Sequence, residues 1–478
     1  MAADESSRGI RSIGAHIPAR RLDRAEIATT FGKGGGRGTR AVASFDEDTT
    51  TMAVEACRSG DLCAGDPPLM ALWFTTTDPA YLDKTNATAI HAALGVRQRC
   101  PALDFGGGLR SGIGALNAAL RATGDILVVA SDRRGGLPTS ADEATGGDGA
   151  GAVRIGDGDD GPLLATFVAD ASTTTEILDR WRTPGDDRSR AWEERFAEST
   201  YIDLATETFG RALDRADLES SDVDVLIATG MHGRAVARAT KKLGIENVAD
   251  NLDATVGNTG IAQPFVTLAS VLESAEPGQT IAMVHLADGC DVVILETTEH
   301  VAGWSPRRSV AAQVEAGSPL SYGQFLAWRG QVEVEPPNRP GPNRVSASAA
   351  HRRDDWKFRF TGTRDRTTGM LHLPPARVSE KGGAVDDMEP VVMADVPGTV
   401  AAVTIDRLAY SPSPPVVFAV VDFDGGGRAP LELTDVSDPT AVEVGARVEP
   451  TFRRLSTADG IHNYFWKVRM IEQQGEQG

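Results

Sequence analysis

The chain lacks paired cysteines, a long apolar run and an excess of positive charge. Its four cysteines (Cys57, Cys63, Cys100 and Cys290) have no paired spacing, which indicates a reduced, cytoplasmic protein rather than a disulfide scaffold. No apolar run approaches the roughly 18 residues of a membrane span, and the first residues lack a signal-peptide core. A net charge of −19 disfavours nucleic acid and anionic membranes as partners. With 478 residues, the chain is long enough for two or three domains.

Short apolar runs alternate with helical patterns over residues 9–300. Strands are predicted at 126–130, 223–228 and 281–285, and helices at 50–57 and 203–216. Such alternation favours an α/β fold in which helices cover the sheets. We expect two halves, 1–160 and 161–302, that meet in the Gly/Asp-rich stretch 146–161.

The composition changes after residue 302. Residues 303–355 are rich in Pro, Arg, Ser and Gly, which predicts a linker with one helix at 322–328. Residues 356–478 contain short apolar runs separated by turns, at 393–396, 399–405, 416–422, 442–448 and 464–471. These runs predict a small C-terminal β-barrel.

One segment, DFGGGLRSGIGAL at residues 104–116, resembles the nucleophile segment of the thiolase superfamily. In a gapless alignment with the ketoacyl synthases that initiate fatty-acid synthesis, Asp104, Ala115 and Leu116 fall on matching positions. The family's cysteine falls on Leu109. Leucine has no lone pair with which to attack a thioester, so the acyl-enzyme chemistry of the superfamily is not expected here.

Six further segments are similar to hydroxymethylglutaryl-CoA synthase and its relatives, in the same order along the chain. They are IGAHIPARRLDRAEIA, FDEDTTTMAVEA, DPAYLDKTNATAIHAALG, SDRRGGLPTSADEATGGDGAGAVRIG, and HGRAVARATKKLGI followed by GNTG. The resemblance implies a five-layered αβαβα thiolase fold, usually a homodimer. It also implies an acyl-CoA or acyl-carrier thioester as substrate, with no separate cofactor.

The catalytic positions of the resembled family are mostly lost. Its histidine falls on Thr229 and its glutamate on Thr77, whereas its asparagine is kept as Asn258. A Claisen condensation through an acyl-enzyme is therefore not supported. A retained oxyanion contact could still stabilise a thioester enolate, by roughly 3–4 kcal/mol, which suits an aldol or retro-aldol reaction.

Three residues are candidates for catalysis, each with a structural alternative. Asn258 is expected to polarise the thioester, unless it only satisfies backbone groups in a tight turn. His232 is expected to move a proton, because histidines titrate near neutral pH, unless it caps the following helix. Cys290 is a displaced thiol, unless it is simply buried.

Five further residues are expected to bind the substrate. Arg110 and Ser111 follow the nucleophile position and could hold an anionic acyl group. Arg37 and Arg40, in the loop GGGRGTRAV, could bind CoA phosphates, unless they are solvated surface residues. Gly260, the last residue of GNTG, completes this set.

The C-terminal region resembles the OB-fold domain that accompanies thiolases and hydroxymethylglutaryl-CoA synthases as a partner or fusion. The segment FRFTGTRDRTTGMLHLPPARVSEKGG matches the opening of that domain, where the family places a zinc ribbon. Its four cysteine positions are Asp365, Thr368, Ser379 and Gly382. Structural zinc needs four thiolate or imidazole ligands, so we expect a degenerate ribbon without metal.

Three functions fit these observations. The first is a CoA-thioester lyase or aldolase that makes or breaks a carbon–carbon bond through an enolate. The second is a catalytically silent homologue that binds acyl-CoA or supports a thiolase-type partner. The third is a direct acyltransferase. The glycine-rich strings GGGRG and GGDGAG match neither a P-loop nor a dinucleotide fingerprint.

Overall fold

The computed structural model describes residues 7–63, 65 and 67–471, which form two compact units. The first unit runs through Ala43 and includes Asp48–Thr88 and Val96–Phe325. The second unit contains Ser44–Glu47, Ala89–Gly95 and the chain from Leu326 onward. The units therefore divide within the segment that the sequence marks as a linker.

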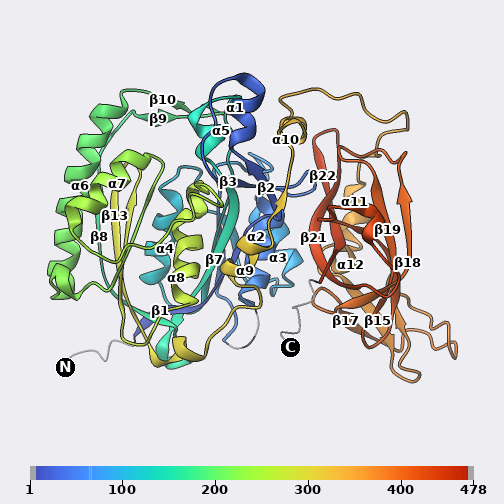
Figure 1. Ribbon diagram of the computed structural model, residues 1–478. Helices are drawn as coiled ribbons and strands as arrows, with labels where there is room; N and C mark the ends of the chain where they lie inside the picture. The colour runs from blue at the N-terminus through green and yellow to red at the C-terminus, as the bar shows by residue number, and fades with distance from the viewer. Residues whose placement is uncertain (1–6, 64, 66, 472–478) are drawn as a thin grey trace, which may run out of the picture. The chain divides into compact units, whose positions relative to one another are not determined.

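The first unit is built on one nine-stranded mixed sheet (Figure 1). Its strands, in spatial order, are β11 (Val225–Gly230), β12 (Thr280–Leu286), β13 (Gly289–Thr297), β8 (Ala165–Thr174), β1 (Arg8–His16), β7 (Asp148–Asp157), β6 (Ile126–Arg133), β4 (Ala71–Thr75) and β5 (Ala102–Asp104). A short β1–β8 pairing joins its two halves. The β11–β12, β4–β6 and β4–β5 pairs are parallel and the other pairs are antiparallel.

Helices cover both faces of each half of this sheet (Figure 1). The two central helices, α4 (Ser111–Leu120) and α8 (Gln263–Leu272), pack on β4, β6, β7, β1 and β11. On the outer faces, α6 (Glu194–Ala216) and α7 (Gly233–Leu243) cover β8 and β11 to β13, and α2 (Thr49–Ser59) covers β1, β6 and β7. The result is the αβαβα layering of the thiolase fold, which confirms the expected fold.

Alternate residues along the strands pack into two separate hydrophobic cores. Along β12, Ile281 and Met283 join the core around α4 and α8, whereas Ala282, Val284 and Leu286 join the core around α6 and α7. Successive side chains of a strand point to opposite faces of its sheet, so a residue's position in this alternation decides which layer it reaches.

Most predicted strands and helices of the first unit are confirmed. The strand runs at 126–130, 223–228 and 281–285 lie in or overlap β6, β11 and β12, and the helix at 50–57 lies within α2. The helix predicted at 203–216 extends back to Glu194. The Gly/Asp-rich stretch 146–161 is mainly the buried strand β7, and only its last residues form the turn to β8.

Smaller elements complete the first unit and lead into the second. The helices of the first unit are α1 (Ala25–Phe31), α5 (Ala141–Thr145) and α9 (Val310–Glu315). Two more helices, α3 (Ala87–Ala93) and α10 (Tyr322–Trp328), begin in the first unit and end in the second. The strands are β2 (Arg20–Asp23), β3 (Thr39–Val42) and β14 (Ser318–Pro319), which form one sheet, and β9 (Arg180–Trp181) with β10 (Arg190–Ala191), which form another. The bounds of α10 match the helix predicted in the linker.

The second unit is a closed five-stranded barrel of the OB type with a small sheet beside it. Its strands are β18 (Gly398–Asp406), β19 (Val416–Phe423), β20 (Arg428–Leu433), β21 (Arg447–Ala458) and β22 (Ile461–Met470). The smaller sheet contains β15 (Thr361–Asp365), β16 (Leu371–His372) and β17 (Met388–Val392), and two short helices, α11 (Ala347–His351) and α12 (Asp354–Lys357), precede it.

Two of the strand predictions for the barrel are wrong. Residues 393–396 form a turn after β17. Residues 442–446 form a loop that includes Gly445 at φ +95°, a left-handed conformation that ends an extended run. The strand β20 was not predicted, because Pro430 interrupts its apolar alternation.

Within the part of the chain that the structure describes, no helix is both long and apolar enough to span a bilayer.

Candidate functional site

Leu109 stands at the turn between β5 and α4. Gly106 in this turn has φ +65°, and a Cβ atom there would lie 2.5 Å from Oγ of Ser111. Glycine therefore lets the chain reverse directly into α4. Leu109 is half-buried and lines a cavity of about 440 Å³. A hydrocarbon side chain thus occupies the position that the sequence resemblance assigns to the family's nucleophile, and this correspondence stays a prediction.

The four positions that correspond to the family's catalytic residues gather where the two halves meet. Thr229 is the second-last residue of β11, Thr77 follows β4, and Asn258 precedes the 3₁₀ turn Gly260–Ala262. The amide Nδ2 of Asn258 donates to the carbonyl of Gly230, 2.9 Å away. Contacts through Asp132 join Thr77 to the same turn. Contacts therefore link Thr77, Thr229 and Asn258 in one region of the fold, whereas their correspondence to the family's catalytic residues stays a prediction.

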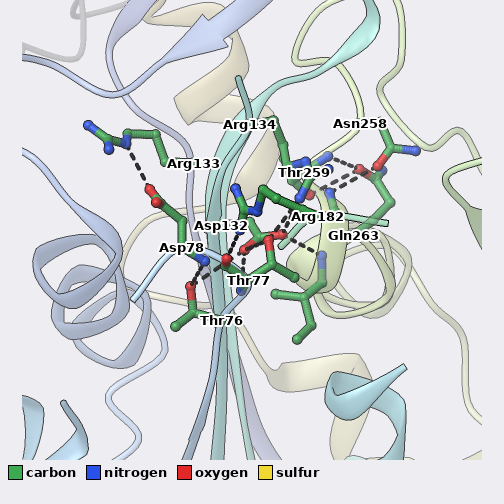
Figure 2. Close-up of polar contacts among 12 residues, drawn as sticks. Thr76, Thr77, Asp78, Asp132, Arg133, Arg134, Arg182, Asn258, Thr259 and Gln263 are labelled. Carbon is green, nitrogen blue, oxygen red and sulfur yellow. Dashed lines mark hydrogen bonds and ion pairs between the residues drawn. The ribbon is translucent and has the colours of Figure 1, made fainter. Parts of the chain in front are cut away.

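Asp132, at the end of β6, is the hub of this region (Figure 2). Its side chain is fully buried. It accepts hydrogen bonds from the backbone N–H of Thr77 at 2.7 Å, the Thr77 hydroxyl at 2.8 Å and the N–H of Ile261 at 3.0 Å. Arg134 adds an ion pair at 3.2 Å. One carboxylate therefore fixes the end of β4 against the turn that follows Asn258.

Thr77 cannot replace the glutamate of the resembled family. Its hydroxyl donates to Asp132 and accepts from Nη1 of Arg134 at 2.8 Å, and its carbonyl accepts from Arg182 (Figure 2). A threonine hydroxyl does not ionise at neutral pH, so it cannot act as a carboxylate acid or base does. The position is therefore structural in this chain.

The Asn258 side chain bonds mainly to backbone groups, which was the alternative to a catalytic role in the sequence analysis. Its Oδ1 accepts from the N–H of Gly260 at 2.9 Å, and one Nδ2 hydrogen goes to Gly230. The amide has two N–H donors, so one remains for a ligand oxygen. Its role in polarising a thioester stays a prediction.

His232 caps α7. Its Nδ1 accepts from the N–H of Ala235 at 3.2 Å, and its Nε2 lies 2.8 Å from the carbonyl of Glu194. This pattern assigns the proton to Nε2 and uses both ring nitrogens on the backbone. His232 lines the cavity, but a proton-transfer role would require it to release one of these contacts.

Cys290 faces away from the site. It belongs to the core around α6 and is fully buried, because residues 290, 292 and 294 of β13 point to that layer. Burial raises the pKa of its thiol to about 12. The expectation of a catalytic thiol is corrected, since a buried neutral thiol is a poor nucleophile.

Arg40 and Gly260 are also corrected. Arg40 is fully buried, and its guanidinium donates to the carbonyls of Glu143 and Arg134. It therefore cannot reach a CoA phosphate. The N–H of Gly260 is bonded to Asn258, and a Cβ atom at this position would lie 2.2 Å from Oδ2 of Asp132. Gly260 allows that close approach and does not contact a substrate.

The other three expected binding residues differ in their exposure and in their contacts. Arg37 is exposed in its loop, so a phosphate contact stays a prediction. Arg110 forms a two-point ion pair with Asp291 and also donates to Thr174 and to the carbonyl of Asp288. This pairing offsets the positive charge of Arg110, so little of that charge remains to attract an anionic acyl group. Ser111 begins α4 beside Gly106, and its role is untested.

The cavity beside Leu109 has several polar groups on its wall. Its lining consists of Leu109, Ser140, Ala141, Asp142, Thr145, Asp179, Arg180, Ala191, Glu194, Tyr201, Met231, His232, Gly233, Arg234, Leu286, Ala287 and Asp288. Ion pairs join Arg180 to Asp142 at 2.6 Å and Arg234 to Glu194 at 3.5 Å.

Two other carboxyl groups on the cavity wall have pKa values above the usual range for aspartate. Burial raises the pKa of Asp179, and burial together with the charge of Asp179 raises that of Asp288. Burial, with Asp179 nearby, also raises the pKa of the Tyr201 phenol. Carboxyl groups shifted in this way are suited to acid/base chemistry. No sequence motif contains Asp179, Tyr201 and Asp288 together, because these residues come from separate elements.

The four zinc-ribbon positions converge in the second unit without forming a metal site. The buried Asp365 accepts from the Thr368 hydroxyl at 2.6 Å and from the N–H groups of Thr367 and Thr368. Hydrogen bonds from Ser379 and Thr368 hold the pKa of this carboxyl well below its usual range. A Cβ atom at Gly382 would lie 3.3 Å from Thr368. One carboxylate, two hydroxyls and a glycine do not fit tetrahedral zinc.

Comparisons with known proteins agree with this architecture. Residues 390–453 match the family model of the ChsH2 C-terminal OB-fold domain. Hydroxymethylglutaryl-CoA synthase of Aeropyrum pernix is 28% identical over 351 residues, or 69% of this chain and 96% of that protein. The enzyme of Methanocella arvoryzae is 25% identical over 348 residues, or 68% of this chain and 99% of that protein.

Solved structures show the same fold. A crystal structure of hydroxymethylglutaryl-CoA synthase complexed with CoA matches with a TM-score of 0.59 at 16% identity, covering 71% of this chain and 95% of that chain. The curacin-pathway HMG synthase in complex with holo donor-ACP matches with a TM-score of 0.57 at 20% identity, covering 67% and 88%. The chain is thus a thiolase-fold homologue of the hydroxymethylglutaryl-CoA synthases that carries a C-terminal OB-fold domain.

Proposed function

We propose that the protein is an acyl-CoA-handling enzyme that forms or cleaves a carbon–carbon bond through a CoA enolate, without a cysteine adduct. The observation that carries this proposal is the cavity that ends on Leu109 and has Asp179, Tyr201 and Asp288 on its wall. It offers an apolar contact and groups able to exchange protons where the related enzymes carry their thiol.

The chemistry without an acyl-enzyme follows from the residues present. Leu109 cannot form a covalent bond with an acyl group, and Cys290 belongs to the opposite layer. An aldol or retro-aldol step needs only a proton acceptor, a proton donor and stabilisation of the enolate oxygen. The remaining N–H of Asn258 is the candidate for that stabilisation.

A CoA or acyl-carrier thioester is the substrate class that we propose. Two of the similar structures are described as complexes with CoA and with a donor acyl-carrier protein. The exposed Arg37 is the candidate phosphate contact in this chain, because an arginine can bind a phosphate through two parallel hydrogen bonds. A homodimer and a thiolase-type partner remain predictions.

Exchange of solvent deuterium at the α-carbon of bound acyl-CoAs tests this function without knowledge of the true substrate. A thermal-shift screen would first identify the acyl-CoAs that bind, and mass spectrometry would then follow deuterium uptake and any products. Enolisation predicts exchange that falls in the Asp179→Asn or Asp288→Asn variant. Binding without exchange across the panel would reject the enolate route, and transfer of the intact acyl group to an acceptor would instead indicate the acyltransferase.

A silent acyl-CoA-binding homologue is the second candidate. This candidate is favoured because both ring nitrogens of His232 contact backbone groups, and Asn258 uses its Oδ1 and one of its Nδ2 hydrogens in the same way. This reading predicts that acyl-CoA raises the melting temperature while neither exchange nor product appears.

A further inference from the structure

A buried histidine lies one strand away from the position where the family's histidine is missing. Thr229 on β11 and His285 on β12 are register partners in a parallel pair. The Thr229 hydroxyl lies 2.9 Å from Nδ1 of His285. Side chains at registered positions of neighbouring strands lie on the same face of the sheet. An imidazole therefore stands on the face that the lost histidine would have used.

The ring of His285 is directed at the start of α4. His285 continues the alternation of Ile281 and Met283, which pack in the core around α4 and α8. The backbone of Leu109 acts on the ring and raises its pKa, while Nε2 is buried and has no hydrogen-bond partner among the described residues. Leu109 lines the cavity, as do Leu286, Ala287 and Asp288, the three residues that follow His285 in the chain.

Burial keeps the ring of His285 neutral. Burial lowers the pKa of His285 to about 4, although Asp291 opposes this shift. Asp291, the register partner of His285 on β13, is already engaged by Arg110 and by the Ser172 hydroxyl at 2.6 Å. The ring is therefore in its basic form at neutral pH. An unpartnered buried nitrogen typically costs about 1–3 kcal/mol, which calls for an explanation.

We propose that His285 replaces the missing histidine as the proton-transfer group for an acyl thioester bound against Leu109. This inference rests on the proposed function. In the retro-aldol direction, the ring proton is on Nδ1 and is donated to the Thr229 hydroxyl, so Nε2 is free to take the proton of the β-hydroxyl group as the bond between the α- and β-carbons breaks. The bonding electrons form the thioester enolate, and the imidazolium returns the same proton to the α-carbon. The products are a shortened acyl-CoA and a carbonyl compound.

A cysteine placed at position 109 would test the placement of the ring without any substrate. In the Leu109→Cys variant, a thiol beside Nε2 should form a thiolate–imidazolium pair. Its reaction with iodoacetamide, mapped to residue 109 by mass spectrometry, should then titrate at least about one pH unit below the ordinary thiol value of roughly 8.5. A thiol pKa at or above that ordinary value would overturn the placement.

The matched comparison is Leu109→Cys with His285→Asn. Asparagine keeps an amide near the Nδ1 position for Thr229 and removes the group at Nε2. The alkylation rate at pH 7 should fall by about tenfold, whereas any contribution of the α4 N-terminus persists in both proteins. His300→Asn in the same Leu109→Cys background is the control, because His300 is exposed and does not line the cavity, and it should leave the rate unchanged. Equal rates with and without His285 would refute the inference.

Deuterium exchange separates this inference from the function on which it rests. If exchange in the wild type is lost in His285→Asn while acyl-CoA still binds, both hold. If the wild type exchanges and His285→Asn exchanges equally, His285 is not the proton carrier but the enolate function stands. If the wild type shows no exchange, the function fails, while the thiol titration still reports the position of the ring.

Discussion

The hydroxyl of Thr368 donates a 2.6 Å hydrogen bond to the carboxylate of Asp365, at two positions where the resembled zinc ribbon has cysteines. Ser379 joins the same carboxylate. A hydrogen-bonded cluster thus closes the loop between these residues. The charge of Asp365 matters here, because charge-assisted hydrogen bonds are stronger than neutral ones.

Purified protein should therefore contain zinc well below one equivalent per chain, and EDTA should not shift its melting temperature. Metal analysis by mass spectrometry with a melting curve checks both points. About one tightly held zinc per chain would show that other residues supply ligands.

Acid should weaken the second unit through Asp365. The folded-state pKa of this carboxyl lies below its unfolded value, so its contribution is fully present above about pH 4 and is lost as pH falls through the folded pKa. Asp365→Asn should lower the melting temperature at pH 7 and flatten the loss of stability below pH 4. Asp387→Asn, at a partly exposed carboxyl paired only distantly with Arg366, is the control and should change little. An unchanged melting temperature in Asp365→Asn would contradict the role of the cluster.

Asp132→Asn should destabilise the first unit strongly. The substitution removes the charge that faces Arg134 and replaces one acceptor oxygen with an NH2 group that faces N–H or O–H donors. Breaking a buried pair in this way costs about 3–5 kcal/mol. Urea unfolding measures the loss. Asp78→Asn, which breaks the partly exposed pair with Arg133, is the matched control and should cost at most about 1 kcal/mol. Equal losses in the two variants would contradict the hub role of Asp132.

His285 predicts a stability slope on the acid side of neutrality. Its folded pKa of about 4 lies below the unfolded value of roughly 6.5, so the unfolded chain binds a proton that the native protein does not. Stability should therefore fall as pH drops from about 6.5 to 4, by up to about 1.4 kcal/mol per pH unit from this group. The His285→Asn variant should lack that part of the slope in urea titrations. A slope that persists unchanged would mean that the ring is protonated in the fold.

Acetyl-CoA should leave no stable acyl adduct on the protein. Leu109 offers no nucleophile, and burial raises the pKa of the Cys290 thiol to about 12. Intact-mass spectrometry after incubation checks this expectation. A stoichiometric adduct on Cys290 or on a serine would contradict it.

Asn258→Ala should slow deuterium exchange by about 30- to 1,000-fold, which corresponds to roughly 2–4 kcal/mol of transition-state stabilisation. The affinity for acyl-CoA should change much less, because the ground-state carbonyl gains little from the contact. Asn251→Ala is the matched control, since its amide also donates to a strand carbonyl, that of Ala228. Equal effects of the two variants would show that Asn258 acts only through the fold.

The sequence by itself determined the architecture of the chain. The alternating apolar runs of β6, β11 and β12 and the ordered motifs around Leu109 predicted the thiolase fold. Leu109 also led to the prediction that the usual nucleophile is absent. These features are local, because strand periodicity and side-chain chemistry can be read from neighbouring residues. The wrong strands near 393 and 442 arose where turn geometry overrode an apolar run.

Only the tertiary structure decided which side chains meet at the site. Cys290 and His285 lie five positions apart, yet the alternation of their strands sends them to opposite layers. Arg40 looked like an exposed loop cation and is buried, whereas Asp179, Tyr201 and Asp288 share one cavity wall. Their proximity depends on how separate elements pack across the sheet, and no spacing along the chain encodes that distance.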